Sequence, residues 1–117
     1  MNRATRKVNN MAKLTSNGTV LAEMVSEREC NDGADADQMT LRWRITRRAM
    51  SSGFILVKRD TWSDYGFGNG PTYHAGTWKR DGKIKAHLLS DQAALVAALE
   101  LWASALRKNG WTAQVNV

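Results

Sequence analysis

Apolar and polar residues alternate along the stretch 41–48, LRWRITRR, with arginines at most of the polar positions. A period of two indicates a β-strand with one buried face and one solvated face. Turn-forming residues follow at 51–53, and 54–59 is rich in strand-forming side chains. The pattern therefore predicts an antiparallel hairpin with strands at 40–49 and 54–59. The arginines are expected to share one face of the first strand.

A second alternation runs through 72–89, where an Asp-Gly pair at 81–82 separates two stretches of alternating polarity. An Asp-Gly pair favours the type I′ turn of two-residue hairpins, because both central residues take a positive φ. We therefore expect a second hairpin, with Ile84 facing the core. Lys83 and Lys85 then face solvent and repeat the basic alternation of the first strand.

The clearest element is a helix predicted over 91–108, where leucines recur on one stripe at helical spacing. Ser90 supplies a hydroxyl for the N-cap, and the Asn-Gly pair at 109–110 supplies a left-handed stop. Residues 111–117 alternate in polarity again and predict a closing strand.

The amino-terminal third carries weaker signals. Residues 1–19 are polar and basic without periodicity, which predicts a flexible arm. Residues 20–27 place apolar side chains on one side and two glutamates on the other, which predicts a short helix, and the acidic stretch 29–38 predicts a loop. The domain at 20–117 is expected to have an α+β fold: an antiparallel sheet of four to five strands, covered on one face by the C-terminal helix.

The positive charge of the chain is concentrated in its second part. The 117 residues carry a net charge of +6, with an isoelectric point near 9.9. Five basic and six acidic side chains leave residues 1–37 at −1, whereas twelve basic and five acidic ones leave residues 38–117 at +7. The excess over residues 38–117 is therefore not simply that of a basic amino-terminal tail.

A basic sheet face suits nucleic-acid phosphates, because bound cations release counterions and arginine can hold a phosphate through two N–H groups. We therefore predict a non-enzymatic nucleic-acid-binding protein, whose arm adds non-specific affinity through Arg3, Arg6 and Lys7. The alternative is a solvated sheet face that only discourages aggregation. The predicted nucleic-acid-binding residues are Arg42, Arg44, Arg47, Arg48, Lys83 and Lys85.

Residues 61–71 combine three glycines with aromatic side chains and predict a long loop. Its rings either close over one end of the core or anchor a protein partner. The second interpretation gives an alternative function: a small inhibitor or adaptor, such as a phage- or plasmid-borne anti-CRISPR or anti-restriction factor, that binds a larger host protein. A homodimer through the strand at 111–117 is a further alternative. The predicted partner-binding residues are Trp62, Tyr65, Phe67 and Tyr73.

Signals for catalysis and cofactors are weak. Neither histidine has a neighbouring cysteine at metal-binding spacing, and Cys30 lies among acidic residues that disfavour its thiolate. The glycines of 66–70 run into Pro71 and not into a helix, which argues against a nucleotide cradle. No apolar run approaches the roughly 18 residues of a membrane span, and a single cysteine suits a reducing compartment. We therefore expect a cytoplasmic protein without enzymatic activity, bound metal or cofactor.

Overall fold

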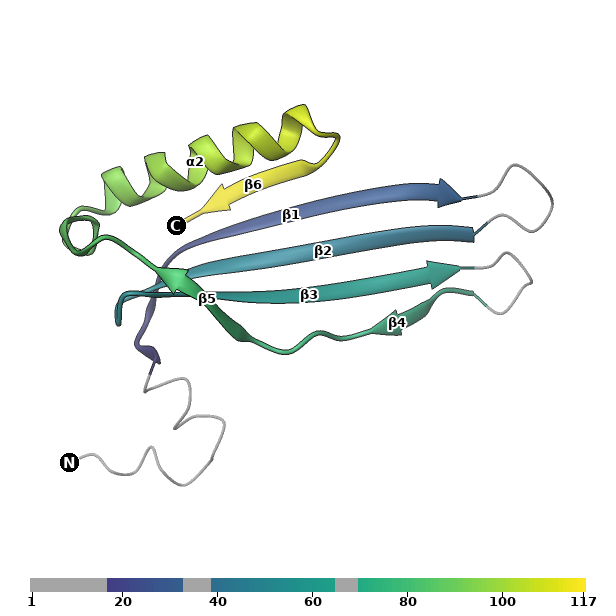
Figure 1. Cartoon of the computed structure of the whole chain (residues 1–117), viewed down its shortest axis with the longest axis horizontal. Coiled ribbons are helices and arrows are strands. Elements are labelled where there is room, and N and C mark those ends of the chain that lie inside the picture. Colours follow the sequence, from purple (N-terminus) through teal and green to yellow (C-terminus); the bar gives the residue numbers. More distant parts are fainter. Residues whose placement is uncertain (1–16, 33–38, 65–69) are drawn as a thin grey trace, which may run out of the picture.

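The structure, a computed structural model, describes residues 17–32, 39–64 and 70–117 (Figure 1). Its strands form one antiparallel sheet in the order β4-β3-β2-β1-β6, and β5 also pairs with β3. The α+β fold with a C-terminal helix is confirmed, and the sheet has six strands where four to five were expected. The elements are β1 (Val20–Asp32), β2 (Met39–Met50), β3 (Phe54–Asp64), β4 (Thr72–His74), β5 (Lys79–Lys83), the 3₁₀ helix η2 (Ala86–Leu88), α2 (Gln92–Lys108) and β6 (Thr112–Asn116).

β1 corrects two predictions, the short helix and the first part of the acidic loop. Val20–Asp32 is one long strand, and Cys30 lies within it. Ala22, Met24 and Ser26 are buried at a spacing of two, which places the intervening glutamates on the other face. β1 pairs with β2 on one side and β6 on the other, and these ladders outweigh the helical spacing of its apolar residues.

The hairpin predicted around 51–53 is confirmed. β2 and β3 pair in a continuous antiparallel register. The turn between them uses Gly53, whose φ of +96° lies in the left-handed region that favours glycine. β3 continues to Asp64, so Trp62 is a strand residue and not part of a loop.

The second predicted hairpin is wrong. The Asp-Gly pair at 81–82 lies inside β5 and not at a turn, and β5 pairs with β3. The chain then leaves the sheet through η2, and Ile84 and Leu88 pack against the hydrophobic core. Burial of these two side chains outweighs the local preference of Asp-Gly for a turn. Lys85, which immediately precedes η2, therefore lies outside the sheet.

The C-terminal helix is confirmed to within one residue at its start. Its N-cap is Asp91, one residue after the predicted Ser90, and Asp91 Oδ1 accepts a hydrogen bond from the Ala94 N–H at 3.2 Å. Gly110 follows the last turn with a φ of +87°, as the Asn-Gly stop predicted. The closing strand is also confirmed, as β6, which pairs with β1.

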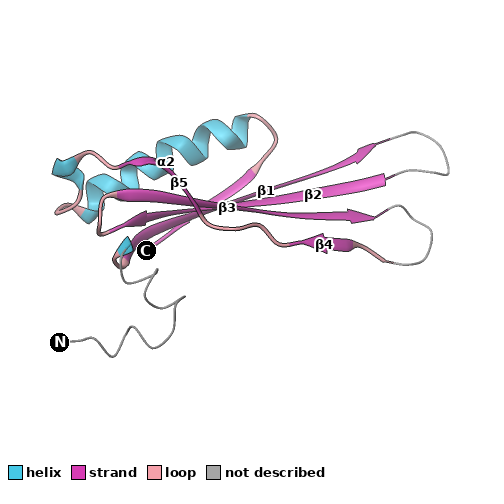
Figure 2. Ribbon diagram, turned by 60° about the horizontal axis from the view of Figure 1, so that its bottom comes forward, coloured by secondary structure: helices cyan, strands magenta, loops and turns pink. Residues whose placement is uncertain are grey.

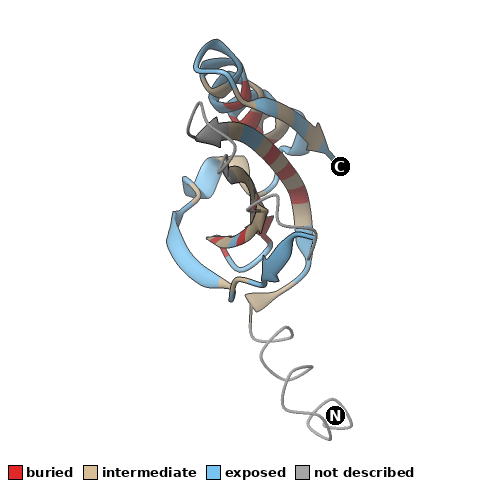
Figure 3. Cartoon of the chain, turned by 90° about the vertical axis from the view of Figure 1, so that its right-hand side faces the viewer, coloured by how far each residue is buried: buried red, intermediate tan, exposed pale blue. Residues whose placement is uncertain are grey.

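α2 forms a second layer over one end of the sheet (Figures 1 and 2). It packs against β1 and β6, and the core cluster joins Leu95 and Leu99 of the helix to Ala22 and Ala49 of the sheet. The long strands continue well beyond the helix in Figure 1, and Figure 3 shows how strongly the sheet curls along its length. Four apolar residues outside the core cluster are accordingly only half-buried: Leu41, Trp43, Ile45 and Trp111.

Candidate functional site

The strand register divides the side chains of β1, β2 and β3 between two faces. Directly paired residues point to the same face, and successive residues point to opposite faces. The helix-side face, which α2 covers at one end, holds the core residues Ala22 and Ala49. The open face is the other one, and it holds Arg42, Arg44 and Arg48.

Glutamates of β1 form ion pairs with the arginines of the open face. Glu27 lies opposite Arg44, with Oε2 2.8 Å from Arg44 Nε, and its Oε1 is 3.6 Å from Arg42 Nη2. Glu23 lies opposite Arg48, with Oε2 2.8 Å from Nε. These side chains are 27–37% exposed, so solvent screening leaves each pair worth about 1 kcal/mol or less. The pairs nevertheless occupy the guanidinium groups.

Two aromatic rings stack beside the same arginines. Trp62 and Tyr73 have ring centroids 4.8 Å apart and an interplanar angle of 28°. Arg42 Cζ lies 4.4 Å from the Trp62 ring centroid, and Arg44 Cζ lies 5.1 Å from it. Both separations suit cation–π attraction. The structure thus brings two of the predicted partner-binding residues together, and Tyr73 is half exposed.

Trp78, which the sequence analysis did not single out, lies over another part of the open face. Its ring centroid is 4.4 Å from Arg48 Cζ and 5.3 Å from Lys58 Nζ. A concavity of about 390 Å³ opens beside it, and both Glu23 and Glu27 line this space together with the cations. No local pattern indicated that the segment carrying Trp78 runs beside β3, between β4 and β5.

Asp60 fixes that segment to the sheet. Its carboxylate is buried and accepts hydrogen bonds from the Gly76 N–H at 2.9 Å and the Tyr73 hydroxyl at 3.1 Å. Gly76 passes so close to β3 that a Cβ there would lie 2.0 Å from the Arg59 carbonyl oxygen. Partial desolvation and the hydrogen bond to Asp60 raise the pKa of Tyr73. Asp60 has a structural role that its sequence neighbours did not reveal.

The open face is close to neutral, unlike the basic face that was predicted. β1, β2 and β3 give it four basic and five acidic side chains. The difference arises because β1 is a strand and brings three glutamates into register with β2. The side chains counted are Arg42, Arg44, Arg48 and Lys58 against Glu23, Glu27, Glu29, Asp60 and Asp64.

The helix-side face carries positive charge that no described carboxylate of the same three strands compensates. Arg28, Arg47 and Arg59 point to this face, and no carboxylate does so among the described side chains of β1, β2 and β3. Within the described residues, none of the three arginines forms an ion pair. Arg28 and Arg59 are exposed. Arg28 was not predicted, because it was assigned to no regular element, and the sequence left Arg59 only a possible member of the basic face.

Arg47 corrects the prediction that all the arginines of 41–48 share a face. It points toward α2, and its Cζ lies 4.3 Å from the ring centroid of Trp102. Its Nε and Nη1 are buried, with no hydrogen-bond partner in the part of the chain that the structure describes. Burial lowers the pKa of Arg47 and the charge of Asp81 opposes that shift, but an arginine remains protonated in proteins.

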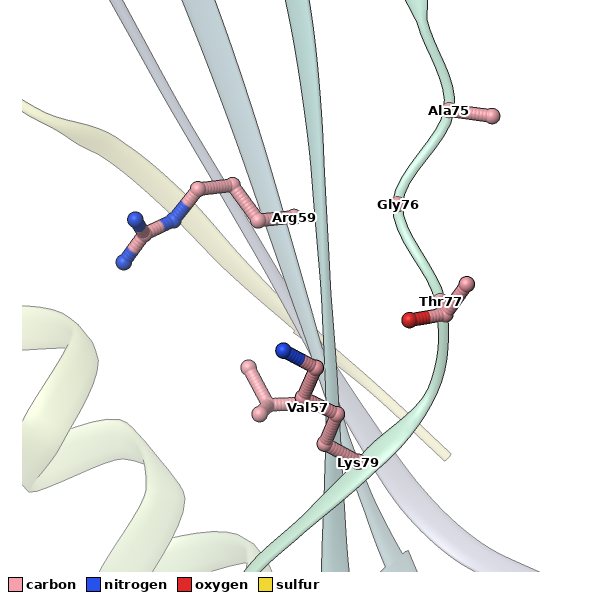
Figure 4. Close-up of a pocket in the computed structure, with 6 residues that line it drawn as sticks. All are labelled: Val57, Arg59, Ala75, Gly76, Thr77 and Lys79. Atoms are coloured by element: carbon pink, nitrogen blue, oxygen red, sulfur yellow. The ribbon is translucent and has the colours of Figure 1, made fainter.

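Two clefts meet at Arg59 on the helix-side face. The first, of about 250 Å³, is lined by Arg28, Trp43, Ile45, Arg59 and Trp111. The second, of about 410 Å³, lies between β3 and the segment 75–79. In Figure 4 the Arg59 side chain extends away from this segment, while the Thr77 hydroxyl and the Lys79 side chain point toward β3. The clefts therefore combine cationic, hydroxyl and indole groups.

The remaining predicted residues do not join the arginines of the open face. Lys83 ends β5, where its Nζ lies 5.3 Å from the Phe54 ring centroid, and Lys85 lies outside the sheet. The following fall outside the described residues: Tyr65, Phe67, Arg3, Arg6, Lys7 and the acidic stretch 33–38.

β6, through which a homodimer was predicted, is an outer strand of the sheet. Arg107 donates to the Ala113 carbonyl oxygen from Nε at 3.0 Å and from Nη2 at 2.7 Å. Arg107 belongs to α2, and a charged group bound to the backbone of an outer strand opposes pairing with another chain there. Dimerisation stays a prediction.

No family model, curated protein or solved structure matches the chain. The described residues contain no group of three or more His, Cys, Asp or Glu side chains that could hold a metal ion. Among the helices of the same residues, none has the length and apolar character needed to cross a membrane.

Proposed function

We propose that the protein is a non-enzymatic nucleic-acid-binding protein, and that it holds phosphates on the arginines of the helix-side face. The observation that carries this proposal is the charge difference between the two faces. Arg28 and Arg59 are exposed and without a carboxylate partner among the described residues, whereas the arginines of the open face are only partly exposed and are ion-paired. A phosphate binds an unpaired guanidinium without displacing a carboxylate.

Binding on the open face has a further cost. A phosphate approaching Arg44 or Arg48 meets the glutamates that already hold those side chains, and like charges repel at that distance. The helix-side arginines offer the same bidentate N–H geometry without this repulsion. The originally predicted residues Arg42, Arg44 and Arg48 therefore rank below Arg28 and Arg59 as phosphate ligands.

The test is fluorescence anisotropy of labelled single-stranded and duplex oligonucleotides, titrated at several salt concentrations. The double variant Arg28→Gln/Arg59→Gln is expected to reduce the slope of log affinity against log salt by about 1.4 for single strands and about 1.8 for duplexes. The matched control is Arg42→Gln/Arg44→Gln, which removes the same charge from the open face. A larger loss in the control, or no binding by the unmodified protein at low salt, contradicts the proposal.

The layer formed by Trp62, Tyr73 and Arg42 supports a second candidate function, the inhibitor or adaptor that docks onto a host protein. Tryptophan, tyrosine and arginine dominate the energetic centres of protein interfaces, and Tyr73 is 50% exposed. The variant Trp62→Ala is expected to lose a co-purifying protein that Trp78→Ala retains. If both variants recover the same proteins as the unmodified chain, this candidate fails.

A further inference from the structure

Two of the five tryptophans lack the stacking partners that the other three have. Trp62, Trp78 and Trp102 each lie beneath the guanidinium of an arginine. Trp43 and Trp111 have no cation or ring stacked on them within the described residues. Both line the 250 Å³ cleft of the helix-side face, and both are half-buried.

The same cleft holds the two unpaired arginines. Arg28 lies directly opposite Trp43 in the β1–β2 ladder. Arg59 lies opposite Ile45, which places it diagonally across from Trp43 on the other side. Neighbouring strands are about 4.8 Å apart, so the two guanidinium groups flank the indole from strands roughly 10 Å apart. Unstacked rings and unpaired cations therefore occur together here.

Trp111 is held at the edge of the cleft by the end of the helix. Gly110 takes a φ of +87° and reverses the chain, and the Trp111 N–H donates to the Leu106 carbonyl oxygen at 3.1 Å. The backbone at Trp111 is thereby fixed between α2 and β6. An anchored backbone reduces the conformational freedom that is lost when a ligand stacks on the ring.

We propose that this cleft binds an unpaired nucleobase against Trp43 and Trp111, with the adjoining phosphates on Arg28 and Arg59, so that the protein prefers single-stranded nucleic acid. This inference rests on the proposed function and adds the strandedness of the ligand. Aromatic rings stack on exposed bases regardless of sequence, whereas a duplex keeps its bases inside the helix and presents mainly phosphates to a cleft of this size.

The second cleft indicates the direction in which a bound nucleic-acid strand crosses the sheet. It shares Arg59 with the first cleft and adds the Thr77 hydroxyl and Lys79, which lie beyond β3 (Figure 4). A strand with one base in the first cleft can place its next phosphates on these groups. The bound strand then crosses β1, β2 and β3 instead of following one of them.

The experiment compares three ligands of equal length with the full chain: a single strand, a duplex, and a single strand that has an abasic sugar at every position. The single strand is tested as oligo(dT) and as oligo(rU), which distinguishes DNA from RNA. The unmodified protein is expected to bind the single strand at least about fivefold more tightly than the abasic strand, because one stacked base supplies about 5- to 150-fold in affinity. The unmodified protein is also expected to bind the single strand more tightly than the duplex.

Substitutions of single tryptophans test where the nucleobase stacks. Trp111→Leu is expected to lower single-strand affinity by about 5- to 150-fold and to leave duplex affinity unchanged, while Trp111→Phe retains most of the binding. Trp62→Leu, on the open face, is the matched control and is expected to change neither affinity. If Trp111→Leu does not fold, the abasic comparison on the unmodified protein decides the question.

The two proposals fail in different ways. Equal affinity for the normal and abasic strands overturns base stacking but leaves phosphate binding on the arginines intact. Equal losses for single strand and duplex in Trp111→Leu also overturn it. Absence of binding to all three ligands at low salt overturns the proposed function itself.

Discussion

Arg44 and Arg47 lie three positions apart on β2 and have opposite environments. Arg44 faces the open side, where a glutamate from the next strand is 2.8 Å away. Arg47 faces α2, where it meets the Trp102 ring, and it forms no ion pair among the described residues. The two residues have the same side chain, but the strand or helix that faces each arginine determines whether its charge is available to a ligand.

The same difference holds for the two faces as wholes. On the open face, β1 contributes glutamates in register with arginines, and the charges cancel. On the helix-side face, β1 contributes small residues beneath α2 and Arg28 beyond it. One face is thus an internally satisfied polar surface, whereas the other combines a hydrophobic core with unpaired cations. Availability of charge, and not the number of basic residues, distinguishes them.

The largest expected effect comes from the apolar part of the helix-side face. Leu99→Ala is expected to lower the free energy of unfolding by about 2–5 kcal/mol, because Leu99 is buried in the core cluster. Leu101→Ala on the same helix is the control, since Leu101 is 76% exposed. Urea denaturation of both variants provides the measurement. Similar losses for the two would show that α2 does not pack as described.

The next effect concerns the carboxylate that fixes the segment carrying Trp78. Asp60→Ala is expected to lower the free energy of unfolding by about 2–3 kcal/mol, because the partly buried Gly76 N–H and the Tyr73 hydroxyl lose their acceptor. Glu29→Ala removes an exposed carboxylate of the same face and is expected to change stability by less than about 0.5 kcal/mol. Thermal unfolding distinguishes them. Equal melting temperatures would remove the structural role assigned to Asp60.

A smaller effect tests the compensation of charge directly. Glu27→Gln releases Arg42 and Arg44 from their shared carboxylate and is expected to lower stability by about 1 kcal/mol or less. It is also expected to steepen the salt dependence of oligonucleotide binding, because two more guanidinium groups become available. Glu29→Gln changes the net charge equally without breaking any ion pair among the described residues. Identical salt slopes in the two variants would mean that the ion pairs do not mask the open face.

The smallest effect is a pH dependence at Tyr73. The pKa of Tyr73 is raised in the folded state above the ordinary tyrosine value of about 10. Below that ordinary value, the hydrogen bond from Tyr73 to Asp60 contributes its full stabilisation. This contribution is lost as the pH rises through the folded-state pKa. Tyr73→Phe is expected to flatten this part of the alkaline stability profile. Because Tyr73 is half exposed, the difference is expected to be slight. A profile unchanged by Tyr73→Phe would assign the alkaline loss to other groups.

Elements defined by local signals could be predicted from the sequence. The helix has a cap, a leucine stripe and an Asn-Gly stop, and the first hairpin has a glycine that the turn requires. β1 could not be predicted because its buried positions are Ala22, Met24 and Ser26, which give little alternation in hydrophobicity. The helical spacing of its other apolar residues was the stronger pattern. Pairing of β1 with β2 on one side and β6 on the other outweighed this preference for a helix.

The error in the predicted site followed from the misassignment of β1 alone. The basic alternation of Arg42 and Arg44 was visible, but their carboxylate partner lay in a segment predicted to be helical. Arg28 and Trp43 become neighbours only once β1 and β2 are paired. Contacts between strands distant in sequence are set by register, which a single sequence does not reveal.

The most direct test of the charge difference is the rate at which each arginine reacts with an arginine-specific dicarbonyl reagent, followed residue by residue by mass spectrometry. We predict that Arg28 and Arg59 react faster than Arg44 and Arg48, and that an added single-stranded oligonucleotide slows the first pair alone. Faster reaction of Arg44 and Arg48, or their protection by the oligonucleotide, would contradict the account and return the phosphate site to the open face.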